Sequence, residues 1–164
     1  MLQETPTTPA PGSEPTHYRD VEALGERIAE LSALISAATF HLLTMIREFD
    51  ERGGWACGFR SCAHWLSWRT GLSMGSAREK VRVARALADL PRISEAIRRG
   101  EICYSKVRAL TRIATLETEE RLLDFARAGT VSHVERLVRA WRTLDRDKER
   151  EQEAERHASR YLDT

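Results

Sequence analysis

Apolar side chains recur every three or four residues along most of the chain, the spacing that gathers them on one face of an α-helix. The longest run begins after Asp20 and continues to Gly53-Gly54, and it predicts a first helix of about 30 residues. No run alternates apolar and polar positions between turn residues, so no β-strand is predicted. The apolar positions of this first helix are Leu24, Ile28, Leu31, Ile35, Leu42, Met45, Ile46 and Phe49.

Capping residues, glycines and one proline divide the rest of the chain into shorter helices. Ser61 is expected to cap a helix that ends near Thr70, and Ser73 a second helix that stops at Leu90-Pro91. Further helices are predicted over 92–99, from a cap at Ser105, over 118–128, and from a capping box formed by Ser132 and Glu135. The predicted fold is all-α, a bundle of about seven helices with helix–turn–helix-like hairpins and long first and last helices.

The ends of the chain differ in composition from its middle. Residues 1–17 are rich in Thr and Pro and are predicted to form a disordered tail, whereas residues 18–164 are expected to form one helical domain. The first residues lack the basic start and apolar stretch of a secretory signal. No run reaches the roughly 18 apolar residues of a membrane span. We therefore expect a cytoplasmic protein with no membrane partner.

Charge is small in total but unevenly distributed. The net charge of the chain is +1. Residues 1–59 carry 4 basic and 9 acidic side chains, residues 60–113 carry 12 and 4, and residues 114–164 carry 10 and 12. A basic middle between acidic flanks is typical of a surface that contacts a polyanion such as DNA. The alternative is an ordinary helical surface that is solvated by arginine.

The segment 61–90 has the spacing of a helix–turn–helix, with Gly71-Leu72-Ser73 as its turn. The second helix of such a unit can present its first turns to a DNA groove. A simple packing hairpin is the alternative, because many helical hairpins turn at a glycine without touching DNA. The candidate DNA-binding residues of this unit are Ser76, Arg78, Lys80, Arg82 and Arg85, and three of them, Arg78, Arg82 and Arg85, form one stripe.

A second unit of this kind covers Leu90 to Leu110, with Gly100-Glu101-Ile102 at its turn. The stretch resembles the helix–turn–helix of partition-type centromere-binding proteins over a short length. Its candidate phosphate or base contacts are Lys106, Arg108 and Arg112. A packing hairpin, with Arg108 bonded locally to a helix end, is an equal alternative.

The sequence offers no constellation typical of catalysis or metal binding. Cys57, Cys62 and His64 lie close together but lack the second ligand pair of a structural zinc site. No histidine has the neighbours of a catalytic triad, and no glycine-rich phosphate loop is present. Neither a cofactor, a metal nor a small-molecule substrate is expected, and the four tryptophans are expected in the core.

Several short motifs between Gly54 and Ile102, together with the end of the chain, resemble those of a known family. They are Gly54-Trp55, Ser61, Trp65-Leu66, Gly71-Leu72-Ser73, Ala77-Arg78, Val83 to Leu87, Leu90-Pro91, Ala96-Ile97 and Gly100-Glu101-Ile102, with His157 to Asp163 at the end. Over roughly residues 20–164 the chain resembles the domain of unknown function 222 family, also called the 13E12 repeat family. The resemblance implies a helical region that usually precedes an HNH endonuclease domain, whose centre uses His and Asn around a metal. This sequence contains no Asn, so we expect the nuclease part to be absent and the domain to be truncated relative to the family.

These observations favour a non-catalytic, DNA-binding or DNA-positioning module associated with HNH endonucleases. Two alternatives remain open. One is a module for protein interaction or self-association, as a homodimer or with a separate nuclease domain, indicated by the long first helix and the polar last one. The other is an inactive remnant of a truncated nuclease-family protein.

Overall fold

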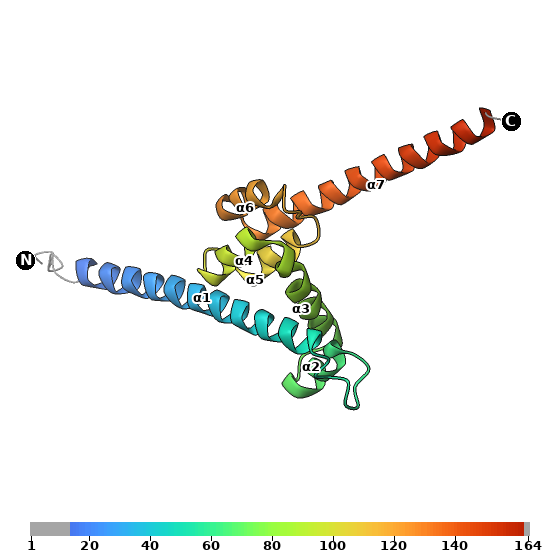
Figure 1. Ribbon diagram of the computed structural model, residues 1–164. Coiled ribbons are helices and arrows are strands. Elements are labelled where there is room, and N and C mark those ends of the chain that lie inside the picture. Colours follow the sequence, from blue (N-terminus) through green and yellow to red (C-terminus); the bar gives the residue numbers. More distant parts are fainter. Residues whose placement is uncertain (1–13, 163–164) are drawn as a thin grey trace, which may run out of the picture.

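The computed structural model describes the backbone of residues 14–162 and the side chains of residues 18–153 and 156, and this part of the chain is helical without strands. Two long helices project in opposite directions from a central cluster of short ones (Figure 1). The elements are α1 (Glu14–Glu51), α2 (Cys62–Thr70), α3 (Met74–Ala86), the 3-10 helix η1 (Leu87–Asp89), α4 (Pro91–Arg98), α5 (Tyr104–Leu110), α6 (Glu119–Ala128) and α7 (Val131–Leu162). The prediction of an all-α fold with long first and last helices is confirmed.

The predicted tail and the first helix meet earlier than expected. Residues 1–13 lie outside the described residues, and the helix α1 already includes residues 14–17. At the other end of the helix, Gly53 has a positive φ of 64°, where the chain turns away after Glu51. The prediction of an end at the glycine pair is therefore confirmed.

Two predicted caps of the first hairpin are confirmed. The Ser61 side chain accepts a hydrogen bond from the His64 amide at the start of α2, and Ser73 accepts one from the Ser76 amide at the start of α3. The predicted end of α3 at Leu90 is wrong. The helix ends at Ala86, its last turn tightens into η1, and Pro91 begins α4 at a position where its missing N–H costs nothing.

Two other predicted caps are wrong. Helix α5 begins at Tyr104 after Cys103, so Ser105 lies inside its first turn. Helix α7 begins at Val131, and its capping pair is Thr130 with His133 rather than Ser132 with Glu135. The His133 amide donates to Thr130 Oγ1 and the Thr130 amide donates to His133 Nδ1, each over 3.3 Å. An imidazole nitrogen here takes the accepting role of Glu or Gln in a capping box.

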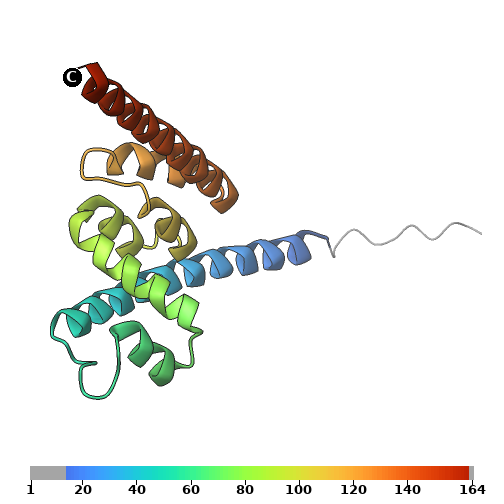
Figure 2. The same cartoon turned by 90° about the vertical axis from the view of Figure 1, so that its right-hand side faces the viewer.

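The core lies where the C-terminal half of α1 packs against α3 and α4, and it continues through α5 to α6 and α7. Figure 2 shows α4, α5 and α6 stacked between the two long helices, whereas α2 lies on the other side of α1. Fully buried aliphatic side chains fill this stack, including those of Leu43, Ile93, Ile97, Ile102, Val107, Leu110 and Val134. The expectation that all tryptophans are in the core is wrong for Trp68 and Trp141, which are 67% and 40% exposed.

Helix α4 is capped by a carboxylate from another helix. Its own N-cap residue, Leu90, offers no side-chain hydrogen bond. Glu119, at the start of α6, is completely buried, and its Oε2 accepts the amides of Arg92 at 3.0 Å and Ile93 at 3.2 Å. These donors are among those that an α-helix leaves unpaired at its first turn, where its dipole also favours a negative charge. These two hydrogen bonds to Glu119 thus fix α6 against the start of α4.

Gly100 allows α4 to approach α1 closely. It adopts a left-handed φ of 73° after the last turn of α4, as the sequence predicted. A Cβ at this position would lie 2.6 Å from the carbonyl oxygen of Ala33 in α1. The position therefore requires glycine for two reasons, its backbone conformation and the absence of a side chain.

Helix α1 differs from expectation in its hydropathy. The segment Tyr18–Glu51 contains an 18-residue window with a mean hydropathy of 1.5, enough by length and composition to cross a membrane, and 11% of that window is buried. Large apolar residues are interspersed with Ala, Ser and Thr, and residues 31–46 contain no Asp, Glu, Lys or Arg. This corrects the expectation that no run approaches that threshold, although a core helix of a water-soluble protein can meet the same criterion.

We predict that Glu119→Ala lowers the free energy of unfolding by about 3 kcal/mol, because the amides of Arg92 and Ile93 lose their acceptor. Glu119→Gln keeps one acceptor oxygen and is expected to cost roughly half as much. Urea unfolding followed by circular dichroism measures both. The exposed Glu117→Ala is the control and should stay within about 0.5 kcal/mol of the native protein. Equal stabilities of the Glu119→Ala and Glu117→Ala variants would contradict the capping role.

Gly100→Ala is expected to destabilise the protein by about 3 kcal/mol, because it combines left-handed strain with a clash against the backbone of α1. Gly71→Ala is the matched control, because Gly71 has the same φ of 73° and no atom within 4 Å of the added Cβ. It should cost only the strain, about 1 kcal/mol. Thermal and urea unfolding of the two variants separates these effects, and equal losses would show that the approach to α1 is unimportant.

Candidate nucleic-acid interface

The arginine stripe predicted on α3 lines one hollow of the surface. Arg78, Arg82 and Arg85 face a cavity of about 580 Å³ together with the start of α2 and Thr111. Arg78 and Arg85 are exposed, and Arg78 forms no ion pair or side-chain hydrogen bond within the described part of the chain. The three predicted side chains therefore share one face, as their spacing of three and four residues requires.

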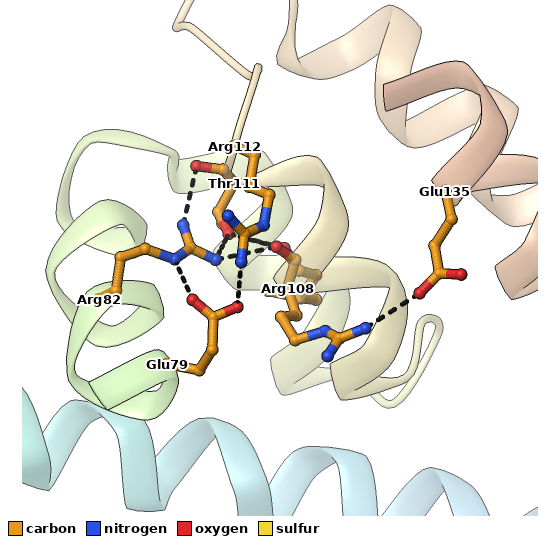
Figure 3. Close-up of polar contacts among 7 residues, drawn as sticks. Glu79, Arg82, Arg108, Thr111, Arg112 and Glu135 are labelled. Carbon is orange, nitrogen blue, oxygen red and sulfur yellow. Dashed lines mark hydrogen bonds and ion pairs between the residues drawn. The ribbon is translucent and has the colours of Figure 1, made fainter. Parts of the chain in front are cut away.

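Arg82 has a structural role within this stripe. Its guanidinium donates from Nη2 to the carbonyl oxygen of Arg108 over 2.9 Å and from Nη1 to that of Thr111 over 3.3 Å (Figure 3). Both carbonyls belong to the C-terminal end of α5, where an α-helix leaves its acceptors unpaired. Arg82 thus joins α3 to the end of α5. Its positive charge also interacts favourably with the negative end of the α5 helix dipole.

Glu79 connects two of the candidate arginines. One carboxylate oxygen accepts from Arg82 Nε at 2.6 Å and the other from Arg112 Nη2 at 2.5 Å, so the carboxylate lies between α3 and α5 (Figure 3). Burial alone raises the pKa of Glu79, but the hydrogen bonds and charges of the two guanidiniums outweigh it and hold that pKa below its ordinary value. Glu79 therefore stays ionised and keeps Arg112 against α3.

A second hollow of about 320 Å³ lies between α5 and α7. Arg108 extends across it and donates to Glu135 over 2.9 Å (Figure 3). Arg139 and Arg142 line its α7 side, are exposed, and have no side-chain partner among the described residues. Both hollows reach the C-terminal end of α5, so their arginines form one surface, which we call the arginine face: Arg78, Arg82, Arg85, Arg108, Arg112, Arg139 and Arg142.

Acidic residues neutralise part of this surface. Asp50 of α1 lies 2.7 Å from Arg85, and their hydrogen bond raises the pKa of Arg85. Glu79, Glu135 and the lining residue Asp89 bring the acidic side chains at the arginine face to four. Seven arginines against four carboxylates leave a net charge of +3. The basic excess of residues 60–113 is thus reduced by both acidic flanks without being cancelled.

The other predicted residues lie apart from the arginine face. Lys80 Nζ sits 4.2 Å from the centre of the Tyr104 ring, and burial lowers the pKa of this lysine. Lys106 Nζ donates to the carbonyl oxygen of Ala126 over 2.6 Å and so caps the end of α6. Ser76 lies in the first turn of α3, bonded to Ser73. Both lysines are therefore engaged within the fold.

The prediction of α5 as a groove-reading helix does not fit its surroundings. Helix α5 contacts α3, α4, α6 and α7, and Val107, Ala109 and Leu110 are buried. A helix enclosed on these sides cannot enter a DNA groove. Arg108 and Arg112 reach the surface only along its edge, so the second hairpin serves mainly for packing.

Arg139 and Arg142 were not predicted from the sequence. Both follow Glu135 at helical spacing, on a helix whose neighbouring positions Val134 and Val138 are buried. That spacing could have placed them beside the core. Nothing in the sequence, however, placed α7 next to α5. The contact between the two helices is long-range and decides which arginines gather.

The described residues contain no group of three or more His, Cys, Asp or Glu side chains that could hold a metal ion. Cys57 is exposed, Cys62 is buried and Cys103 is half-buried, all as free thiols.

The arrangement of the arginine face can bind anionic groups by hydrogen bonds and charge.

Comparison with known proteins agrees with the family resemblance. No curated protein and no solved structure matches the chain. The family model described as "Domain of unknown function (DUF222)" matches residues 20–164, which include every helix of the central cluster. The chain therefore belongs to the domain of unknown function 222 family.

Proposed function

We propose that this protein is a non-catalytic, cytoplasmic DNA-binding module and that the arginine face is its contact surface for the phosphate backbone. The observation that carries the proposal is that α3, α5 and α7 line two hollows, both reaching the C-terminal end of α5, with seven arginines. Guanidinium groups bind phosphate by paired hydrogen bonds and stay charged at any physiological pH. We also propose that the protein is associated with an HNH endonuclease. In that case the DNA held on the arginine face would be the substrate of the endonuclease.

Three arginines of the face are the main phosphate contacts. Arg78, Arg139 and Arg142 are exposed and make no intramolecular ion pair among the described residues. The other four hold helices or carboxylates in place, and they add positive potential while remaining bonded. Contacts of this kind position a protein on DNA without reading bases, so weak sequence preference is expected.

We predict that Arg139→Gln with Arg142→Gln weakens binding to a fluorescein-labelled duplex roughly tenfold at low salt, about 1.4 kcal/mol. The slope of log affinity against log salt concentration should fall by about 2, because each phosphate contact releases about one counterion. Fluorescence anisotropy between about 50 and 200 mM salt measures both quantities.

The control for this experiment is the double variant Arg69→Gln with Arg121→Gln. Both residues are exposed and line neither hollow, so the variant removes the same charge from elsewhere. Equal losses in the two double variants would indicate only a response to net charge. Failure of the native protein to bind DNA at low salt, or binding that salt does not weaken, would also contradict the proposal. Metal-dependent cleavage of a plasmid by the pure protein would contradict its non-catalytic part.

A further inference from the structure

Helix α1 carries a second apolar pattern besides the one that packs on the core. From Val21 to Met45, apolar residues recur at alternating intervals of three and four, which is a heptad repeat with a period of 3.5. The first position of each heptad, a, holds Val21, Ile28, Ile35 and Leu42, and the fourth position, d, holds Leu24, Leu31, Ala38 and Met45. We call these eight residues the heptad seam. They span roughly 37 Å of helix at 1.5 Å per residue.

The heptad seam faces away from the side of α1 that packs on α3 and α4. The side that packs on α3 and α4 contains Ser36, Phe40 and Leu43, of which Ser36 and Leu43 are 6% and 1% exposed. On a helical wheel with 100° per residue, that side is centred roughly 130° from the seam. One helix therefore carries two separate apolar faces, and the fold uses only one of them.

The heptad seam is exposed along its whole length. Its seven large side chains are 37% to 62% exposed, and Ala38 is exposed as well. Figures 1 and 2 show no other described element beside the N-terminal half of α1. The next position of the same register, Phe49, is covered by Trp65 of α2, with ring centroids 4.2 Å apart. The seam thus ends where α2 covers α1.

We propose that the heptad seam is a dimer interface, and that two copies of this chain join α1 to α1 as a parallel two-stranded coiled coil. A period of 3.5 matches another helix that winds with it, whereas a helix on a flat or globular surface follows 3.6. β-Branched residues at three of the four a positions, with leucine at the first two d positions, are the combination that favours two parallel strands.

The positions that flank the seam distinguish the two helix directions. In a parallel pair, Asp20 faces Gly25 of the second copy and Arg27 faces Ser32, so like charges do not meet there. An antiparallel pair with the seams in full overlap brings Asp20 to Glu48 of the second copy, and Arg27 to His41. The parallel direction avoids the carboxylate repulsion.

The remainder of the fold leaves room for this pairing. Helices α3 and α4 pack on α1 away from the seam, whereas α2 covers the seam register only from Phe49 onward, so the pairing extends from Val21 to Met45. A lipid bilayer is the competing occupant, because α1 is long and apolar enough to cross one. The heptad period and the polar residues at Asp20, Glu22, Glu26 and Arg27 within its first turns favour a protein partner in water.

Sedimentation velocity of the full chain across a wide concentration range tests the proposal. A dimer is expected for the native protein. Ile28→Lys with Ile35→Lys, which places ammonium groups at two a positions, should be a monomer with an unchanged helical spectrum in its globular part. The matched control, Ala23→Lys with Ala29→Lys, adds the same charge to exposed positions outside the seam and should remain a dimer.

Disulfide formation tests the direction of the helices. In a Cys57→Ser background, which removes the exposed native thiol, Leu24→Cys should form a cross-linked dimer when oxidised by glutathione disulfide. In the antiparallel pair the two introduced cysteines would lie roughly 30 Å apart and could not join. Absence of the cross-link in a dimeric protein would overturn the parallel arrangement.

Three other outcomes would overturn the dimer interface itself. The native protein could be a monomer at the highest concentration measured. The lysine variant at the seam could remain a dimer, which would place the contact elsewhere. The native protein could co-sediment with phosphatidylcholine vesicles and lose this property in the seam variant, which would assign the seam to a membrane. None of these measurements depends on DNA binding, so the two proposals can fail separately.

Discussion

The buried carboxylate of Glu119 is the interaction on which the central cluster depends. Helix α4 is short, has no side-chain cap of its own, and packs against α1, α5 and α6. Burying a polar group is costly unless hydrogen bonds replace its hydration. Oε2 of Glu119 accepts both amides at the start of α4, whereas its buried Oε1 has no hydrogen-bond partner among the described residues. The position of α4 then determines where Gly100 meets α1 and how α5 enters the core. The carboxylate thus links the long first helix to the C-terminal half of the chain.

Capping of a helix end by a side chain from another helix recurs at the C-terminal ends of two further helices, where the capping side chains are basic. Arg82 closes the end of α5 and Lys106 closes the end of α6, each from a different helix. A short helix leaves most of its backbone groups unpaired, so short helices rely on side chains from their neighbours. As a consequence, several charged residues that resemble ligand contacts in the sequence are part of the framework. The members of the arginine face without an ion pair among the described residues, Arg78, Arg139 and Arg142, line the two hollows.

Helix α1 shows how one sequence can encode two interfaces. Its core-facing side follows the helical period and its outer side follows the heptad period, and the two patterns overlap over residues 31–46. Together they make the segment apolar on most of its circumference, which explains its hydropathy. Under both proposals, a paired α1 would place two arginine faces on one dimer and would increase the avidity for a long polyanion.

Local chemistry determined the elements of this protein. The spacing of apolar residues, Ser61, Ser73, Gly71 and Gly100 predicted the helices, two caps and two turns, because each depends on residues within one helical turn of itself. The capping of α7 was misplaced because His133 acts as an acceptor, which no simple motif encodes. Only the tertiary structure decided which charged side chains bond to other parts of the fold and which arginines gather on the arginine face. Glu119 is separated from its amide partners by more than 25 residues, and Arg108 from Glu135 by 27. Contacts of that range depend on how helices pack, and the sequence pattern of a single helix does not contain that information.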